Sequence, residues 1–131
     1  MTFRLLPLTE SCLPACLALA CASVAGLTGR QYDARQRAAW VTALQQSAPD
    51  WPVRLSAGSG WLALDSAGQP AGFAWRVARE VDMLYVAPAA ARRGIGRALL
   101  ARLTDDMAGQ LGPWHAAVSD MALPLFEQAG W

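Results

Sequence analysis

The apolar positions in the first half of the chain change their spacing at a few polar, glycine and proline positions. Phe3–Leu6 has the apolar character of a short strand. The apolar run over about 11–25 predicts a helix, which Gly26 ends. A second helix is expected over 33–46, because its first residue is an aspartate that can cap it. The segment 48–52 contains two prolines and is predicted to be a loop.

The second half of the chain has the pattern of strands first and a helix afterwards. Short polar turns separate three apolar segments that predict an antiparallel meander: Trp61–Leu64, Ala71–Val77 and Glu80–Val86. A helix is predicted over 97–108, where Leu100, Leu103 and Met107 recur at three- and four-residue steps. Two further elements are expected after it: a short strand, His115–Val118, and a last helix, Met121–Gln128.

Length, composition and charge limit the classes of protein to consider. The chain has 131 residues, of which 54% are hydrophobic and 16% are charged. These values predict one folded domain, residues 1–131, and exclude a disordered chain. The formal net charge is only +1, so the chain lacks the field that gathers nucleic acid or an anionic membrane surface. We therefore expect neither a nucleic acid nor a membrane as a partner.

Cysteine and histidine are too few for a metal centre. Cys12, Cys16 and Cys21 lie four and five residues apart on one predicted helix, and His115 is the only histidine. No metal is expected, and buried thiols are favoured over reactive ones.

The same apolar helix has an alternative interpretation as the core of a signal peptide. The acidic residue ahead of it and the proline within it favour a cytoplasmic protein.

A turn with two glycines connects the last strand of the meander to the following helix. Gly94 and Gly96 let backbone N–H groups converge, and the helix N-terminus adds a partial positive charge. Arg92, Arg93 and Arg97 add fixed charge around the turn. This arrangement predicts a pyrophosphate site, with a plain strand-to-helix turn as the alternative. The third glycine of a dinucleotide fingerprint and the Gly-Lys-Ser/Thr of a P-loop are absent.

Two consecutive segments carry a family resemblance. Val81–Pro88 followed by Arg92–Leu100 resembles the central motif of the GNAT superfamily of acyl-coenzyme A-dependent N-acetyltransferases. The shared pattern is a hydrophobic strand, Val-x-Pro, and then Arg-Gly-x-Gly-x-Ala-Leu-Leu. The segments 3–24 and 119–131 resemble the first strand and helix and a late segment of the family. The resemblance implies an α/β fold of the GNAT type, with a mixed, mostly antiparallel sheet flanked by helices and coenzyme A held where two neighbouring strands part.

The resemblance also implies acetyl-CoA (coenzyme A) as the cofactor and assigns its contacts. The backbone of Leu84, Tyr85 and Val86 would pair with the pantetheine arm. The pyrophosphate would be held by the backbone amides of seven consecutive residues: Arg92, Arg93, Gly94, Ile95, Gly96, Arg97 and Ala98. Tyr32 and Trp40 resemble the second-helix pattern of some bacterial members and would wall the acceptor pocket. Aromatic packing is the competing interpretation of these two residues.

The sequence departs from the family pattern at three positions and at its end. Ala91 stands where Gln or Arg is usual, although Arg93 satisfies the pattern in a shifted frame. Phe126 stands where a tyrosine often protonates the departing thiolate, and Ser119 replaces the usual asparagine. Ser119 or water is expected to supply that proton instead. The family usually continues into two more strands after the position of Trp131, so the C-terminal strands are expected to be missing. A truncated sequence, a minimal fold or a partner chain that completes the sheet would each account for this, and a homodimer would cover the open edge.

An amine that attacks a thioester must first lose a proton, which requires a base. Glu80 and Asp82 alternate onto one face of the predicted strand, and either carboxylate, a water or the substrate itself is a candidate. Glu80 aligns with the base position of histone-type members of the family. Tyr85 is expected on the opposite face, as a packing residue.

These observations predict an enzyme. We expect an N-acetyltransferase that transfers an acetyl group from acetyl-CoA to a primary amine of a small molecule or peptide by direct attack. A non-catalytic acyl-CoA-binding or regulatory module is the alternative, favoured by Phe126. A structural or dimerisation domain that binds no coenzyme is the third interpretation.

Overall fold

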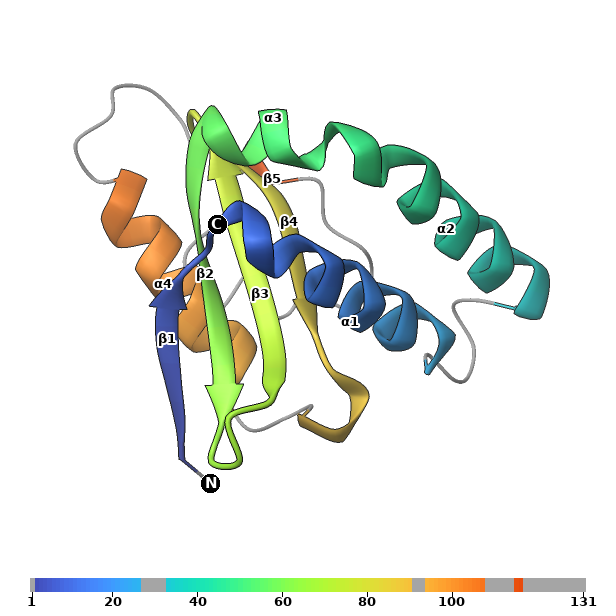
Figure 1. Ribbon diagram of the computed structural model, residues 1–131, viewed down its shortest axis with the longest axis horizontal. Helices are drawn as coiled ribbons and strands as arrows, with labels where there is room; N and C mark the ends of the chain where they lie inside the picture. Colours follow the sequence, from blue (N-terminus) through green and yellow to red (C-terminus); the bar gives the residue numbers. More distant parts are fainter. Residues whose placement is uncertain (1, 27–32, 91–93, 108–114, 117–131) are drawn as a thin grey trace.

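One sheet runs through the described part of the molecule (Figure 1). The structure is a computed structural model that describes residues 2–26, 33–90, 94–107 and 115–116. The strands, in sheet order, are β1 (Phe3–Pro7), β2 (Gly58–Asp65), β3 (Pro70–Val77), β4 (Glu80–Val86) and β5 (His115–Ala116). Strands β1 to β4 are antiparallel neighbours, whereas β5 is parallel to β4. The sheet is therefore mixed and mostly antiparallel, as predicted.

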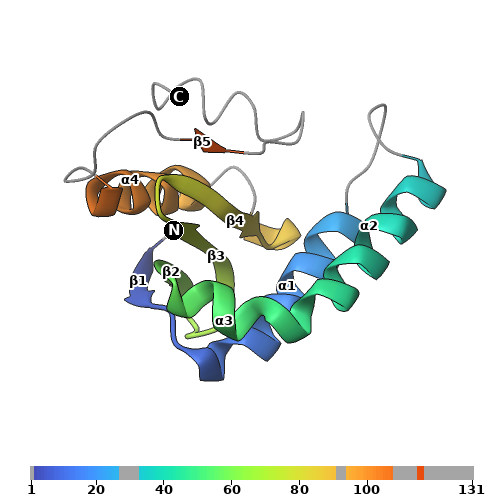
Figure 2. The same cartoon turned by 90° about the horizontal axis from the view of Figure 1, so that it is seen from above.

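Helices cover both faces of this sheet. They are α1 (Leu13–Ala25), α2 (Ala34–Ser47), α3 (Trp51–Ser56) and α4 (Ile95–Met107). Short 3₁₀ turns lie at η1 (Glu10–Cys12), η2 (Ala48–Asp50) and η3 (Pro88–Ala90). Figure 2 shows α4 on one side of the sheet and α1, α2 and α3 on the other.

The sheet separates two apolar clusters. Phe73 and Trp75 are fully buried on the side of α1 and α3. Ala74, which lies between them in β3, is buried with Leu99 and Leu103 on the side of α4. Alternate residues of β3 thus serve opposite faces, as expected for a central strand that is covered on both sides.

The polar start of α2 confirms the predicted helix. The Asp33 carboxylate accepts a hydrogen bond from the Gln36 backbone N–H at 2.7 Å. The Asp33 backbone N–H donates to the Gln36 side chain at 2.9 Å in return. This reciprocal capping box satisfies two N–H groups that would otherwise lack partners at the helix start.

The prediction that 48–52 is a loop is wrong. These residues form η2 and the first turn of α3. Each proline stands at the second position of its helical segment, where no hydrogen bond from the proline nitrogen is needed. Trp51 is only 1% exposed and packs edge-on against Trp75, with 5.2 Å between ring centroids. Burial of this indole stabilises a segment whose proline content alone predicts irregular chain.

The predicted meander and the helix after it are confirmed, with shifted ends. β2 begins at Gly58 rather than residue 61, and α4 begins at Ile95 rather than residue 97. The predicted strand at 115–118 is confirmed for His115–Ala116. Its last two residues and the helix expected over 121–128 lie outside the described residues.

A one-residue bulge interrupts the pairing of β3 with β4. Trp75 lies opposite Met83, whereas the next residue, Arg76, lies opposite Val81. Asp82 is therefore an extra residue in β4 that has no backbone pairing partner in β3. The side-chain alternation of β4 changes phase at this point.

The bulge overturns one expectation about Tyr85. Its ring stacks on Phe73 with 5.8 Å between centroids, on the α1 side of the sheet. Asp82 contacts Trp75 on that same side. The prediction that Tyr85 lies on the face opposite Asp82 is wrong, because strict alternation holds only in a strand without an extra residue.

Candidate active site

The C-terminal half of β4 has one edge paired and one edge turned away from β3. The Ala87 N–H donates to the Ala71 carbonyl oxygen at 2.8 Å. Since N–H groups alternate between the two edges of a strand, that of Tyr85 also faces β3, and those of Leu84 and Val86 face the other edge. Among the described residues, β5 pairs with only the first two residues of β4. The N–H groups of Leu84 and Val86 lie beyond that pairing.

The N-terminus of α4 is the second part of the site. The Ala98 N–H donates to the Gly94 carbonyl oxygen at 3.0 Å and closes the first helical turn. Gly94 has a φ of +83°, and a Cβ atom built on it would meet no atom of the described residues within 4 Å. The N–H groups of Ile95 and Gly96, in the first turn, have no acceptor within the helix. The helix dipole adds a partial positive charge at this exposed end.

Close packing holds these two parts together. The Ile95 side chain is 1% exposed. A Cβ atom at Gly72 of β3 would lie 2.9 Å from Ile95 Cγ2 and 3.2 Å from the carbonyl oxygen of Tyr85. Gly72 therefore lets α4 approach the sheet directly beside β4.

The two carboxylates of β4 have different surroundings. Glu80 lies opposite Val77, which packs on the α1 side, so Glu80 and Asp82 share a face as predicted. The Glu80 side chain is exposed and has no hydrogen-bond or ion-pair partner among the described residues. One Asp82 oxygen accepts from the indole N–H of Trp75 at 2.6 Å, and the other forms an ion pair with Arg54 of α3. Glu80 is thus the more accessible of the two candidate bases.

Trp40 of α2 reaches across to Tyr85 of β4. Its indole N–H donates to the Tyr85 hydroxyl oxygen at 3.1 Å, and the two rings meet edge to face at 6.4 Å. Burial raises the pKa of Tyr85, while the hydrogen bond from Trp40 opposes that shift. Because the phenol oxygen accepts this bond, its own hydrogen is directed elsewhere. The bulge shifts the side-chain alternation of β4 and so places Tyr85 where it can contact Trp40. The hydrophobic pattern of the sequence gives no sign of this shift.

The remaining predicted site residues fall into two groups. Gly94, Ile95, Gly96, Arg97 and Ala98 lie in the first turn of α4 or immediately before it. Tyr32, Arg92, Arg93 and Ser119 lie outside the described residues. Arg54 and Trp75, which engage Asp82, were not predicted. Arg54 follows a segment that was interpreted as a loop, and no local pattern links it to β4.

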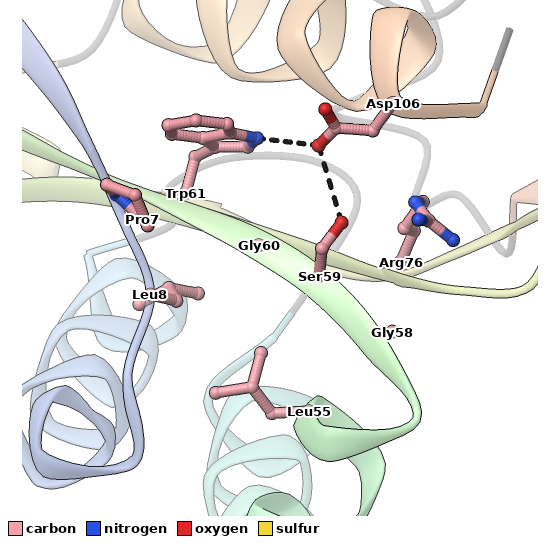
Figure 3. Close-up of a pocket in the computed structure, with 9 residues that line it drawn as sticks. All are labelled: Pro7, Leu8, Leu55, Gly58, Ser59, Gly60, Trp61, Arg76 and Asp106. Atoms are coloured by element: carbon pink, nitrogen blue, oxygen red, sulfur yellow. Dashed lines mark hydrogen bonds between the residues drawn. The ribbon is translucent and has the colours of Figure 1, made fainter.

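A separate hollow lies at the far end of α4 (Figure 3). It has a volume of about 360 Å³ and is lined by Pro7, Leu8, Leu55, Gly58, Ser59, Gly60, Trp61, Arg76 and Asp106. Asp106 accepts from the Trp61 indole N–H at 2.7 Å and from the Ser59 hydroxyl at 3.3 Å. Arg102 lies over the same indole, 3.8 Å from its centroid. These contacts attach the last turns of α4 to β2.

The three cysteines are free thiols in η1 and α1. Hydrogen bonding to Thr9 lowers the pKa of Cys12, whereas burial raises the pKa of Cys16 to about 12. Over the described ranges, His, Cys, Asp and Glu form no group of three or more that could hold a metal ion. None of the described helices is both long and apolar enough to span a membrane.

Comparison with known proteins shows the family to which this fold belongs. A family model described as an acetyltransferase (GNAT) domain matches residues 30–131. The chain belongs to the GNAT acetyltransferase family, as its central motif indicated. The strand, bulge and glycine turn described above all lie within the matched residues.

Individual relatives agree with this assignment. The chain is 32% identical over 102 residues to the "uncharacterized N-acetyltransferase YafP" of Escherichia coli K12. The matched segment covers 78% of this chain and 63% of YafP. It thus spans less than two thirds of that relative.

Two solved structures share the fold. A GCN5-related N-acetyltransferase from Rhodopseudomonas palustris is similar with a TM-score of 0.85 and 27% identity, over 98% of this chain and 81% of that one. A PaiA N-acetyltransferase from Thermoplasma acidophilum, solved in complex with coenzyme A, has a TM-score of 0.65 and 18% identity, over 82% of this chain and 73% of that one. At that identity, the second similarity concerns the fold alone.

Proposed function

We propose that this chain transfers an acetyl group from acetyl-CoA to a primary amine of a small molecule or peptide. The observation that carries the proposal is the outer edge of β4, where the N–H groups of Leu84 and Val86 point away from β3. The N-terminus of α4 packs on the sheet at Gly72, which pairs with Val86. A strand edge next to a helix N-terminus suits a ligand with an amide-containing arm and a pyrophosphate.

The residues fit each part of such a ligand. The pantetheine amides can pair with Leu84 and Val86 as an added strand would. The start of α4 suits the pyrophosphate, because Gly94 is exposed and a Cβ atom on it would meet no described atom within 4 Å. Arg92 and Arg93 precede this turn in the sequence and supply positive charge. The Thermoplasma structure that shares this fold was solved in complex with coenzyme A, a ligand of the same class.

The bound acetyl-CoA would supply the thioester carbon that the amine attacks. Glu80 accepts the proton that the ammonium form must lose, directly or through a water. A backbone N–H on the outer edge of β4 stabilises the negative charge that develops on the acetyl oxygen. With acetyl-CoA bound, the new C–N bond would replace the C–S bond and the attacking nitrogen would lose its second proton to solvent. The thiolate would leave and take a proton from solvent. A thiol pKa near 8.5 makes this departure feasible without a dedicated acid.

A calorimetric titration with acetyl-CoA tests the site, and the chain offers a matched control. Gly94 and Gly68 both have positive φ, at +83° and +78°, and a Cβ atom on either would meet no described atom within 4 Å. Gly94→Glu and Gly68→Glu therefore impose the same backbone strain, but only Gly94→Glu places a negative charge at the start of α4. We expect Gly94→Glu to weaken binding by about tenfold or more and Gly68→Glu to bind like wild type.

Two results would overturn the cofactor site. One is a wild-type chain that shows no saturable binding at millimolar acetyl-CoA. The other is an equal loss of affinity in Gly94→Glu and Gly68→Glu. Release of free thiol in the presence of a library of primary amines then tests turnover, since a binding module without catalysis would bind acetyl-CoA and release none.

A further inference from the structure

The bulge in β4 determines which side of the sheet each side chain of its C-terminal half faces. Without an extra residue, Val81, Met83 and Tyr85 would share one face of the sheet. In the structure, Val81 packs on the α4 side, whereas Met83 and Tyr85 pack on the α1 side. The single unpaired residue, Asp82, therefore sets the phase of everything that follows it in the strand.

The side chain of Asp82 ties this unpaired residue to two other elements. Trp75, which donates to it at 2.6 Å, stands in β3 directly opposite the next residue of β4. Arg54, which pairs with the other oxygen, comes from α3. The Asp82 side chain is 12% exposed and that of Arg54 is 40% exposed. The bond to the indole is thus largely shielded from water, while the guanidinium faces solvent in part.

We propose that Asp82 is a positioning residue, and that the contacts Arg54–Asp82–Trp75 form a clasp that holds the bulge and so presents Leu84 and Val86 to acetyl-CoA. This inference rests on the proposed function. It gives Asp82 the role of holding the strand in shape and leaves proton transfer to Glu80. The clasp acts through the strand, because Asp82 is separated from Leu84 by one residue and both of its oxygens are engaged.

The clasp requires an ionised carboxylate. Trp75 and Arg54 both donate hydrogen bonds to residue 82, so this residue must accept at two positions. Among side chains of this size, a carboxylate accepts hydrogen bonds at both positions and donates none. In Asp82→Asn, the amide NH₂ must face one of these two donors. One of the two contacts is then lost with little change in side-chain volume, which makes this variant a specific probe of the clasp.

The opposite face of the sheet offers a matched control. Asp106 accepts from the indole of Trp61 at 2.7 Å, a bond of the same kind as that between Asp82 and Trp75 (Figure 3). Trp61 belongs to a regular part of β2, opposite Ala74. Both bonds to Asp106 reach the same oxygen, Oδ2, so the amide oxygen of Asp106→Asn can still accept them. This variant therefore makes the same chemical change beside an indole without touching the bulge.

The experiment compares wild type, Asp82→Asn and Asp106→Asn at a temperature where circular dichroism shows all three folded. Acetyl-CoA affinity is measured by calorimetry, and the Trp40 indole N–H resonance reports the position of Tyr85 without any cofactor. We expect Asp82→Asn to weaken acetyl-CoA binding by about tenfold and to shift the Trp40 resonance. Asp106→Asn should stay within about twofold of wild type and leave that resonance in place.

A third readout separates positioning from proton transfer. If Asp82 is a positioning residue, its variant keeps the pH dependence of kcat that wild type shows, while KM for acetyl-CoA rises. A lost limb of the pH profile with unchanged KM would assign Asp82 as the base and overturn the proposal. Equal effects of Asp82→Asn and Asp106→Asn on affinity and on the Trp40 resonance would overturn it as well.

A second variant covers the case in which Asp82→Asn does not fold. Arg54→Gln removes the partly exposed partner and is expected to weaken acetyl-CoA binding in the same direction by about threefold. Wild-type affinity in this variant would then overturn the clasp. If wild type itself binds no acetyl-CoA, the proposed function fails, whereas a shifted Trp40 resonance in Asp82→Asn still shows that the clasp holds the strand.

Discussion

The carboxylates of β4 show how the environment of a single side chain decides its chemistry. Asp82 is engaged by an indole N–H and a guanidinium. Glu80 lies two residues earlier on the same face, is exposed and has no partner among the described residues. A general base needs a free carboxylate that can reach the substrate amine, and Glu80 meets that requirement better than Asp82.

The first prediction concerns Glu80→Gln. We expect kcat to fall by about 100-fold, because the glutamine amide cannot accept the ammonium proton. The affinity for acetyl-CoA should remain at the wild-type value, since Glu80 stands outside the proposed cofactor edge. Steady-state kinetics with calorimetry measure both quantities. A variant with full kcat would show that water or the substrate amine provides its own deprotonation.

The second prediction concerns Cys16, whose pKa burial raises from 9.0 to about 12. As the pH rises above about 9, the thiol deprotonates in the unfolded chain while the folded chain retains its proton. The free energy of unfolding should therefore fall as the pH rises from about 9 towards about 12. Cys16→Ala should reduce that slope. Urea denaturation across this range measures the effect, with each variant compared to itself at the lowest pH.

Cys12→Ala is the control for this prediction. Hydrogen bonding to Thr9 lowers the pKa of Cys12, so its removal should not reduce the alkaline loss of stability. Cys21 has a pKa raised by burial, which acts in the same direction as that of Cys16. An alkaline slope that is unchanged in Cys16→Ala would contradict the account of Cys16.

At the scale of elements, the approach of α4 to the sheet depends on one glycine. A Cβ atom at Gly72 would stand 2.9 Å from Ile95 Cγ2 and 3.2 Å from Leu99 Cδ1. Both of these side chains are buried and leave little room to move. The helix α4, whose N-terminus we assign to the pyrophosphate, therefore packs against β3 with no space for an added methyl group.

The third prediction is that Gly72→Ala lowers the free energy of unfolding by about 2 kcal/mol through overpacking. Gly68→Ala serves as a comparison, because its α-carbon has open space but a φ of +78°. That strain alone should cost about 1 kcal/mol. Urea denaturation of both variants measures the difference, and a smaller loss in Gly72→Ala than in Gly68→Ala would contradict the packing argument.

Elements with local signals could be predicted from the sequence, and those set by distant contacts could not. Asp33 and Gln36 form their capping box within one turn, so the start of α2 was visible. The helix α3 depends on burial of Trp51 against Trp75, which lies in another element. The bulge residue Asp82 likewise bonds to that tryptophan, in a neighbouring strand, and the sequence around it carries no local signal of a bulge.

At the scale of the whole molecule, the candidate site combines one continuous segment with several distant ones. β4 and the first turn of α4 are close in the sequence, which is why one linear motif indicated the family and also supplied the proposed cofactor residues. Trp40 and Arg54 come from α2 and α3 and meet β4 only in the folded chain. Their contacts with Tyr85 and Asp82 could not be derived from spacing along the sequence.

The most direct test of the account is hydrogen exchange at the backbone amides of β4, measured by NMR with and without saturating acetyl-CoA. We predict that acetyl-CoA slows exchange at Leu84 and Val86, whose N–H groups face the outer edge. The amide of Tyr85 already faces β3 and should change little. Slowed exchange at Tyr85 with no change at Leu84 and Val86, or no change anywhere along β4, would contradict the proposal that acetyl-CoA binds along this strand.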